Sequence, residues 1–447
     1  MAIAVFDIGK TNRKLSLVDA GAIRHTVAAP NRSLPSPPYL HYDAEAIWRF
    51  LLKGLRDFAQ KAKIADIVVV AHGAAGALID AEGGLALPIL DYEHPLEDPE
   101  YDAVAAPFTE TYAPPMANGL NVGRQLHWQA RQFPEGFART RHFLTYPQYW
   151  SFRLSGVAAC EATSLACHTG LWRPAGGGFS SFVDRMGWRD LFPPLVKADA
   201  VLGPVLPEIR KETGLPEDCR VRAGIHDSSA SFLRHRLSRP LPFAVASTGT
   251  WVVCMAAGAD PHGLPENRNC LANVDALGTP VPCCVFMGGR EFSLLTKDLN
   301  GAITTLDAID AVVARGSILV PPVAETGGPF AHLAAGGPRG AGIKSQEESV
   351  ARASLYLALM TDYCFDLIKA AGPIVVEGSL IGNTAFLRGL AALRAPEPVL
   401  VSKDATGTIS GAVTLAGERI PDEPLEVEPL EQPIAAYRRA WREALPA

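Results

Sequence analysis

Residues 3–19 read IAVFDIGKTNRKLSLVD, two apolar runs with a glycine-containing turn between them. The runs from Ile3 to Gly9 and from Lys14 to Asp19 have the length and apolar content of strands, and a third strand is expected over Ala22 to Ala29. Tight turns must join these strands, because only a few residues separate each run from the next. The chain is therefore expected to open with antiparallel strands.

An amphipathic helix and a buried strand are expected next. Asp43 is the expected N-cap of the helix, and apolar residues recur three or four positions apart from Ile47 to Ala59. The run from Ile67 to Ala71 is apolar throughout. The order strand, strand, strand, helix, strand predicts a mixed sheet with a helix on its face, whereas a simple doubly wound nucleotide fold would open strand, helix, strand.

A related order of elements returns in the second half of the chain. Strands are expected at Pro242 to Ser247, at Trp251 to Ala256 and near Val281 to Phe286. A long helix fits Ala351 to Ala370, and a short strand follows from Ile374 to Val376. The matching order in the two halves predicts an internal duplication.

The length of 447 residues is too great for one compact core and indicates two domains. A basic, proline-containing stretch from Arg234 to Leu241 separates the two patterns, so we expect domains at residues 1–236 and 237–447. Hydrophobic residues make up 48% of the chain and charged residues 20%, which is an ordinary globular balance.

Charge, hydropathy and cysteine spacing exclude several classes of protein. A net charge of −6 argues against a nucleic-acid surface, which needs a basic patch to meet phosphates. No apolar run approaches the ~20 residues that span a bilayer, and the first residues lack the basic start of a signal peptide. The eight cysteines show no CxxC pairing, which indicates reduced core thiols in a cytoplasmic protein and no zinc site.

The first candidate site lies in the turn after the first strand. Asp7 ends an apolar run and is followed by Gly9 and Thr11. A carboxylate at a strand end beside a glycine turn suits a magnesium-bound phosphate. Asp7 would hold the metal through water, and the turn N–H groups and the Thr11 hydroxyl would face the phosphate. The alternative is a hairpin in which these residues serve only the turn.

A turn of the same design recurs in the second half, at Ser247-Thr248-Gly249-Thr250. It again follows a strand and combines a glycine with flanking hydroxyl groups. A plain hairpin is again the alternative. Two such loops in matching places support each other, because a phosphate gripped between two domains needs one loop from each.

The third candidate is Asp227, within the run AGIHDSSA at residues 223–230. It follows a glycine and precedes small residues that can start a helix. Deprotonating a sugar hydroxyl for in-line attack calls for a positioned carboxylate, and a helix N-terminus would keep that carboxylate ionised. The alternative is an N-cap aspartate, with His226 as a packed or solvent-facing neighbour.

The fourth candidate is the strand-to-helix turn Glu377-Gly378-Ser379, after which Asn383 and Thr384 open a helix. Glycine at such a turn lets a flat ligand, adenine or ribose, approach the backbone. An ordinary strand-to-helix loop is the alternative.

In order and approximate spacing, these motifs resemble those of the FGGY carbohydrate kinases. The motifs that carry the resemblance are Asp7-Ile8-Gly9-Lys10-Thr11, His226-Asp227-Ser228-Ser229-Ala230, Ser247-Thr248-Gly249-Thr250, Glu377-Gly378-Ser379 and, in the expected final helix, Gly411-Ala412-Val413. The resemblance covers nearly the whole chain. It implies an α/β fold of two ribonuclease-H-like domains, as in actin and hexokinase, with a catalytic cleft between them. Two departures are the low glycine content at Glu377-Gly378-Ser379 and residues 146–156, which follow the family signature only loosely.

The resemblance also implies a role for each candidate residue. Asp227 would be the catalytic base and Asp7 the magnesium ligand. The residues implied in nucleotide binding are Gly9, Thr11, Asn12, Lys14, Thr248, Gly249, Thr250, Gly378, Ser379 and Asn383. ATP and Mg²⁺ are the implied cofactors, a small sugar and ATP are the implied partners, and a homodimer stays open.

Polar and aromatic residues of the first half are candidates for binding the sugar. Such a site needs polar groups to pair hydroxyls and an aromatic wall. The residues expected there, together with Asp227, are His72, Gly73, Gln148 and Trp150. Glu161-Ala162-Thr163-Ser164 supplies further polar candidates. For Trp150 the alternative is core packing.

The resemblance is closest to kinases of deoxy-ketohexoses, L-rhamnulose or L-fuculose, in residues 7–12 and 163–169. It implies ATP-dependent phosphorylation of such a ketose. The alternatives are a kinase of another ketose or polyol such as xylulose or ribulose, a catalytically inactive regulator of the same fold, and an actin-like ATPase that acts on a protein. Sugar-dependent release of ADP separates a sugar kinase from the last two of these classes.

Overall fold

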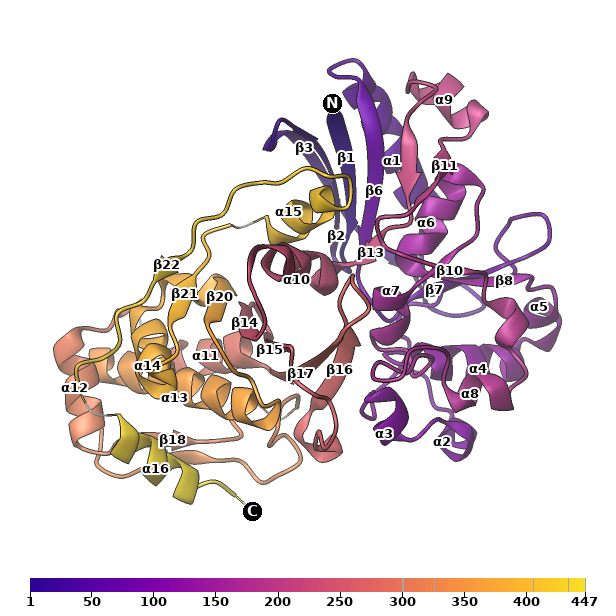
Figure 1. Ribbon diagram of the computed structural model, residues 1–447. Coiled ribbons are helices and arrows are strands. Elements are labelled where there is room, and N and C mark those ends of the chain that lie inside the picture. Colours follow the sequence, from indigo (N-terminus) through magenta and orange to yellow (C-terminus); the bar gives the residue numbers. More distant parts are fainter. Residues whose placement is uncertain (300, 325, 405, 433, 447) are drawn as a thin grey trace. The chain divides into compact units, whose positions relative to one another are not determined.

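The computed structural model describes residues 1–299, 301–324, 326–404, 406–432 and 434–446 (Figure 1). The chain divides into two compact units. The first is formed by Met1–Ser238, Ala272–Pro280 and Thr406–Pro421, and the second by Arg239–Leu271, Val281–Ala405 and Asp422–Ala447. The chain therefore passes from one unit to the other more than once.

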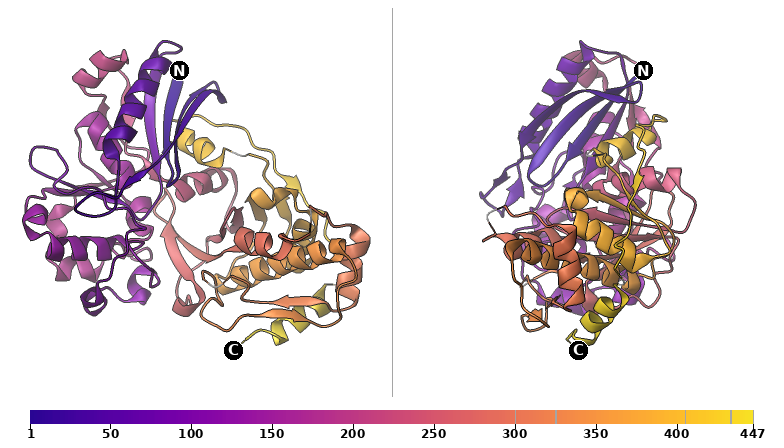
Figure 2. Two further views of the ribbon diagram at one scale, coloured as in Figure 1. Left: turned by 180° about the vertical axis from the view of Figure 1, so that it is seen from behind. Right: turned by 90° about the vertical axis from the view of Figure 1, so that its left-hand side faces the viewer.

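A mixed sheet forms the centre of the first unit. Its strands are β1 (Ala2–Ile8), β2 (Asn12–Asp19), β3 (Ala22–Pro30), β6 (Ile64–Ala71), β11 (Val201–Pro204), β12 (Arg220–Arg222) and β13 (Ile225–His226). Their order is β11-β12-β6-β1-β2-β3, and β13 also pairs with β6. β1 is antiparallel to β2 and parallel to β6, so the predicted mixed sheet is confirmed. Figure 2 shows the twist of its first three strands.

Helices cover both faces of this sheet because the side chains of each strand alternate between them. Ala2, Ala4, Phe6 and Ile8 of β1 pack with α1 (Ala44–Ala59), α6 (Tyr146–Ser155) and α9 (Pro207–Thr213). Ile3 and Val5 pack on the other face with α10 (Asp227–Ser238) and α15 (Gly407–Thr414). The two helical layers are visible in Figure 1. The predicted N-cap of α1 is confirmed, since the Asp43 carboxylate accepts from the Ala46 N–H at 2.9 Å.

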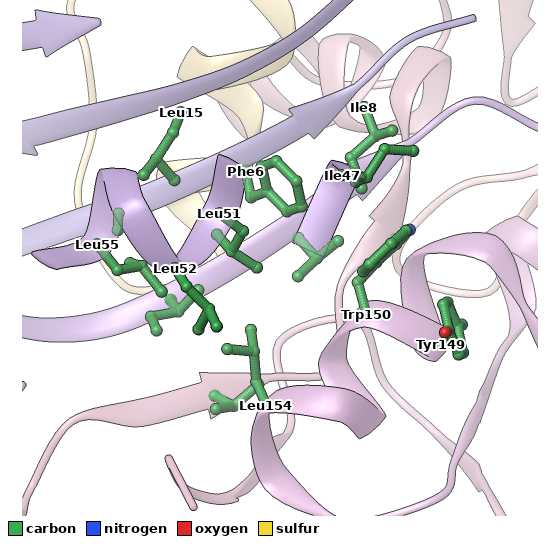
Figure 3. Close-up of a cluster of buried hydrophobic side chains, with 14 of the residues drawn as sticks. Phe6, Ile8, Leu15, Ile47, Leu51, Leu52, Leu55, Tyr149, Trp150 and Leu154 are labelled. Atoms are coloured by element: carbon green, nitrogen blue, oxygen red, sulfur yellow. The ribbon is translucent and has the colours of Figure 1, made fainter. Parts of the chain in front are cut away.

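Trp150 lies at the centre of the first of these cores (Figure 3). Its side chain is 0% exposed, and its ring meets that of Phe6 edge-on with 6.2 Å between the centroids. The ring of Trp48 stacks on it at 6.5 Å. Trp150 therefore joins α6 to both β1 and α1.

A second cluster of elements in the first unit surrounds its own core, with Leu126, Phe143, Leu165 and Phe182 among its buried residues. The helices here are α2 (Pro99–Val104), α3 (Phe108–Thr111), α4 (Val122–Gln132), α5 (Pro134–Ala138), α7 (Ala162–Ala166) and α8 (Ser181–Arg185), with the 3-10 turn η1 (Arg189–Leu191). Its paired strands are β7 (Gly76–Ile79) with β8 (His142–Thr145), and β9 (Cys160–Glu161) with β10 (Leu195–Val196). A short pair, β4 (Ser33–Leu34) with β5 (His41–Tyr42), precedes α1.

The second unit repeats the strand order of the first. Its strands run in the order β17 (Pro280–Phe286), β15 (Val252–Ala257), β14 (Phe243–Thr248), β20 (Ile374–Gly378), β21 (Val399–Val401), β22 (Leu425–Glu426). β16 (Cys270–Val274) lies where the chain passes from the second unit to the first. β14 is antiparallel to β15 and parallel to β20, as β1 is to β2 and β6. The predicted repeat is therefore confirmed in strand order and direction.

Helices complete the second unit. They are α11 (Gly288–Thr296), α12 (Leu306–Ala314), α13 (Gln346–Leu367), α14 (Thr384–Arg394) and α16 (Ala435–Glu443), with the 3-10 turns η2 (Glu266–Arg268) and η3 (Ser379–Gly382) and the pair β18 (Ile318–Val320) with β19 (Gly337–Arg339). The expectation that Gly411-Ala412-Val413 lies in the final helix is wrong, because α16 follows α15. Arg438 and Arg442 of α16 bind the buried Asp362 of α13, each at 2.8 Å.

The structure bears on two features of the composition. All eight cysteines are buried free thiols, as expected for core residues. Within the described ranges, no helix has the length and apolar character needed to cross a membrane.

Replacing Trp150 by alanine should destabilise the fold by about 3–5 kcal/mol, because it removes a fully buried ring from a packed core. Urea unfolding of the full chain measures this loss. The matched control is Trp251→Ala, whose ring is 41% exposed and should contribute much less. An unfolding midpoint of Trp150→Ala equal to that of the parent would contradict the core position of this side chain.

Candidate active site

Asp7 lies near the end of β1, where it pairs with Lys14 of β2 on one side and Val70 of β6 on the other. Its side chain is partly exposed, and no described residue donates a hydrogen bond to its carboxylate. Burial raises the pKa of Asp7 to about 6, the negative charge of Asp227 adds to the rise, and Lys14 opposes it. The backbone of Asp7 is thus held by two neighbouring strands, while the charge of its carboxylate is poorly compensated.

The glycine turn after β1 is held by Asn31. The Gly9 N–H donates to the Asn12 carbonyl at 2.9 Å, and the Asn31 side-chain amide donates to the Gly9 carbonyl at 2.6 Å. The Asn31 backbone N–H donates to the Thr11 carbonyl at 2.8 Å. The side chains of Thr11, Asn12 and Lys14 are exposed, so a ligand can reach them.

Lys10 of the same turn makes an ion pair that the sequence analysis missed. Its ammonium group pairs with the buried carboxylate of Asp91 and lies 3.2 Å from that of Glu93. It also lies 4.8 Å from the ring centroid of Tyr92 and 5.2 Å from that of Tyr42. Burial alone would raise the pKa of Asp91, but hydrogen bonds, led by that from Lys10, lower it. Asp91 follows an apolar run, as Asp7 does, and this signal could have identified it.

Asp227 is the first residue of α10 and directly follows β13, which runs parallel to the end of β6. Its Oδ1 accepts from the Ser228 N–H at 2.6 Å and from the Ser228 hydroxyl at 3.3 Å. Nε2 of His226 lies 3.1 Å from the same oxygen. In the described part of the chain, no such contact reaches Oδ2. The carboxylate is therefore fixed through one oxygen and leaves the other available.

Three histidines interact with the Asp227 charge and are favoured in their neutral form. Burial lowers the pKa of His72 and of His226, and it lowers the pKa of His168 to about 4. The charge of Asp227 opposes each of these shifts, but burial outweighs it. Neutral imidazoles can donate to a hydroxyl oxygen or accept from a hydroxyl proton without competing for the carboxylate charge.

His72 has a free nitrogen and an aromatic wall. Its Nδ1 lies 2.7 Å from the Gly73 carbonyl, whereas its buried Nε2 has no partner among the described residues. The rings of Tyr146, Tyr42 and Tyr92 lie 5.0, 5.5 and 5.7 Å from the His72 ring. A buried nitrogen without a partner is suited to a ligand hydroxyl. Tyr92 is a second residue of this site that the sequence analysis missed.

Gly73 lets the backbone after β6 approach a neighbouring ring. A Cβ atom at this position would lie 3.2 Å from Nε2 of His226 and 3.1 Å from Sγ of Cys167. The residue therefore contributes space, and any larger side chain would push against His226, beside Asp227.

Gln148 and Trp150 are both fully buried. The Gln148 side-chain amide donates to the carbonyls of Ala223 and Gly224, at 3.1 and 3.2 Å, and its oxygen accepts from the Thr145 hydroxyl. Both N–H groups of Gln148 are thus used within the protein. The position of Trp150 in the hydrophobic core favours the packing alternative over a role in sugar binding.

In the glycine turn of the second unit, the Thr248 hydroxyl is bound to other groups of the protein. The Thr248 hydroxyl donates to the Glu377 carbonyl at 2.6 Å and accepts from the Leu380 N–H at 3.0 Å. Gly249 is partly exposed and Thr250 is exposed. Thr248 therefore joins β14 to the end of β20, and the following two residues are accessible to a ligand.

In the turn after β20, some residues are needed to hold the fold and one is accessible to a ligand. Gly378 has φ of 91°, and a Cβ there would lie 2.0 Å from the Thr248 carbonyl, so only glycine fits. Asn383 caps α14 through its side-chain oxygen and donates to the Ser354 hydroxyl at 3.0 Å. Ser379 is exposed. The polar groups of Asn383 are therefore used to position α14.

The acidic residues of the first unit fit a magnesium ion shared with phosphates. Among the described residues, no group of three or more His, Cys, Asp or Glu side chains could hold a metal alone. Mg²⁺ in phosphoryl-transfer sites needs only one or two carboxylates, because water and substrate phosphates supply the other ligands. Burial raises the pKa of Asp7 most and repulsion from Asp227 adds to the rise, and a divalent cation would relieve that repulsion.

Replacing Asp7 by asparagine should raise the melting temperature of the metal-free protein at pH 7.5. Because burial moves the pKa of Asp7 from 3.8 to about 6, the folded state holds the proton more tightly than the unfolded chain does. Stability from the protonated form is present below the unfolded pKa and is lost as the pH rises through about 6. The gain from Asp7→Asn should therefore shrink toward pH 4.

Thermal unfolding in a chelator at several pH values checks this expectation. The control is Asp184→Asn, at an exposed position, which should change little at any pH. A melting temperature of Asp7→Asn at or below that of the parent at pH 7.5 would contradict a destabilising charge at Asp7.

Both halves of the chain match models of one protein family. Residues 2–233 match the N-terminal domain of the FGGY family of carbohydrate kinases, and residues 240–424 match the C-terminal domain of carbohydrate kinase FGGY. Among curated proteins, L-fuculokinase of Escherichia coli K12 is 24% identical over 269 residues, which is 58% of this chain and 57% of the fuculokinase. The chain thus matches little more than half the length of that relative. A xylulose kinase of Staphylococcus epidermidis is 30% identical over 116 residues, 26% of this chain and 23% of that protein.

Solved structures extend the similarity to the whole chain. A carbohydrate kinase from Novosphingobium aromaticivorans superposes with a TM-score of 0.91 at 36% identity, covering 99% of this chain and 98% of that one. A xylulose kinase from Lactobacillus acidophilus shares the fold, with a TM-score of 0.78 at 16% identity and coverage of 99% and 96%. These matches confirm the expected α/β class, and the chain belongs to the FGGY family of carbohydrate kinases.

Proposed function

We propose that the protein transfers the γ-phosphate of ATP to a hydroxyl of a small sugar, with Asp227 as general base. The asymmetry of the Asp227 carboxylate carries this proposal. Oδ1 is held by Ser228 and lies 3.1 Å from His226, whereas Oδ2 has no partner of this kind among the described residues. A carboxylate fixed in this way at a helix N-terminus can accept a hydroxyl proton on its other oxygen.

In the proposed reaction, the sugar hydroxyl gives its proton to Oδ2 while its oxygen bonds to the γ-phosphorus. The bond from that phosphorus to the bridging oxygen breaks, and ADP leaves with that oxygen. The neutral His72, whose Nε2 has no described partner, would bind another hydroxyl of the sugar. Tyr92, whose ring packs against His72, would form part of the wall.

The nucleotide is proposed to bind at the glycine turns. The exposed side chains of Thr11, Asn12 and Lys14 and the backbone at Gly9 would meet phosphate in the first unit. Gly249, Thr250 and Ser379 would provide accessible contacts in the second unit. These loops would be supported by Thr248 and Asn383, whose polar groups bind other protein groups, and by Gly378, where no larger side chain fits.

Asp7 would hold Mg²⁺ together with the phosphates of ATP. When bound, the ion supplies counter-charge to the phosphate oxygens. The support for this role is the position of Asp7 at the strand end and its raised pKa, which reflects burial and a nearby second acid.

The proposed substrate is a deoxy-ketose such as L-fuculose or L-rhamnulose. Similarity to L-fuculokinase supports this class, and similarity to xylulose kinases makes xylulose or ribulose the alternative. A cytoplasmic location is proposed because all eight cysteines are buried free thiols.

Asp227→Asn should lower kcat by about 10²–10⁴ on the best sugar, because general-base help is removed. ATP KM should stay within a few-fold, since the side chain faces the hydroxyl. Coupled ADP release over a panel of ketoses, polyols and aldoses measures both the parent and the variant, with Asp184→Asn as the control.

Two results would contradict the proposal. A turnover of Asp227→Asn within a few-fold of the parent would remove Asp227 as the base. ADP release by the parent that no sugar in the panel accelerates would remove sugar as the acceptor.

A further inference from the structure

A side chain from α6 forms hydrogen bonds with the backbone just before Asp227. Gln148 is 1% exposed, and its amide donates to the consecutive carbonyls of Ala223 and Gly224. Its oxygen is held in turn by the Thr145 hydroxyl. Gly224 has φ of 87°, and a Cβ there would lie 2.7 Å from the Val69 carbonyl, so the segment lies close against β6 at this point.

A second set of hydrogen bonds holds the other end of the segment 223–226. The His226 backbone N–H donates to the Thr163 hydroxyl at 3.2 Å. That hydroxyl donates its own proton to the Glu161 carboxylate at 2.6 Å. Glu161 also accepts from the Thr163 N–H at 2.9 Å and from the Ser164 N–H at 3.1 Å. The carboxylate therefore fixes Thr163 in the rotamer that meets His226.

These three polar side chains are poorly suited to bind a sugar. Gln148, Thr163 and Glu161 are 1%, 0% and 2% exposed. Both N–H groups of Gln148 and the hydroxyl proton of Thr163 already have protein acceptors. A sugar hydroxyl would have to break these bonds, and each broken bond would leave a buried carbonyl or carboxylate without its donor.

We propose that Gln148 and Thr163 are positioning residues for Asp227, with Glu161 holding Thr163. Gln148 fixes residues 223 and 224, Thr163 fixes residue 226, and together they set where Oδ2 of residue 227 points. This proposal rests on the proposed role of Asp227 as general base. It assigns Gln148 and the Glu161–Thr163 pair a function other than sugar binding.

The physical consequence is a loss of rate without a loss of binding. General-base catalysis requires the carboxylate oxygen within hydrogen-bond reach of the reacting hydroxyl. A displacement of about 1 Å can reduce the rate by about 10²-fold, even when the substrate still binds. Removing a positioning residue should therefore lower kcat and leave KM nearly unchanged.

Gln148→Met tests the hydrogen bonds of Gln148, since methionine has similar volume but neither donates to the two carbonyls nor accepts from Thr145. We expect kcat to fall about 10–100-fold, with KM for the sugar and for ATP within about threefold. The matched control is Gln129→Met. Gln129 is also a buried glutamine of the first unit, but its amide donates to the Tyr39 hydroxyl at 2.6 Å. The Gln129→Met variant should lose stability and keep the parental kcat.

A double-mutant cycle separates action through Asp227 from a general structural role. In an Asp227→Asn background, Gln148→Met should change the residual single-turnover rate by less than about threefold, because the base it positions is absent. An equal fold-loss in both backgrounds would overturn the proposal, and so would a rise in sugar KM with unchanged kcat.

Thr163 provides a second test if Gln148→Met folds poorly. Thr163→Val keeps the shape but removes the hydroxyl, and should lower kcat at constant KM. Thr163→Ser keeps the hydroxyl and should restore most of the rate. Equal rates for the valine and serine variants would overturn the role of the hydroxyl.

The two proposals fail in different ways. If Asp227→Asn keeps the parental rate, the assignment of the base falls, and the positioning role falls with it. If Asp227→Asn is strongly impaired while Gln148→Met and Thr163→Val keep parental kcat, only the positioning role is overturned.

Discussion

The parallel pairing of β1, β6 and β13 is the constraint on which the candidate site depends. Asp7 pairs with Val70 of β6, and His226 pairs with the next residue of that strand, Ala71. Because parallel strands end at the same edge of a sheet, Asp7 and Asp227 become neighbours although they are far apart in the sequence. Their mutual repulsion contributes to the raised pKa of Asp7. The fold thus brings two like charges together at the place where the proposed reaction puts a cation and a sugar hydroxyl.

Burial around this edge of the sheet decides which ionisable groups carry a charge. The imidazoles of His72, His168 and His226 are kept neutral because desolvation outweighs their attraction to the Asp227 carboxylate. The positive charge of Lys10 is bound to the buried Asp91. The carboxylates of Asp7 and Asp227 thus lie near neutral imidazoles, which suits the proposed metal ion and sugar hydroxyl.

The repeated strand order does not produce two identical turns. Thr11 is exposed in the first unit, whereas the equivalent turn of the second unit buries Thr248 to join β14 to β20. Thr248 pairs with Gly378 at the end of the two strands, where a Cβ atom on residue 378 would lie 2.0 Å from the Thr248 carbonyl. Thr250, which follows the glycine of the second turn, is exposed as Thr11 is, so both turns present a side chain, and only the second turn also joins two strands through a hydroxyl.

The sequence by itself determined the order of elements, the glycine turns and the two acids Asp7 and Asp227, because strand length, helical periodicity and turn chemistry are local properties. Only the tertiary structure decided which side chains are free. It buried Trp150, used the amide of Gln148 on a distant backbone and paired Lys10 with Asp91. It also joined Ala272–Pro280 and Thr406–Pro421 to the first unit. These outcomes depend on contacts between segments far apart in the chain, and a local pattern carries no record of which partner will satisfy a buried polar group.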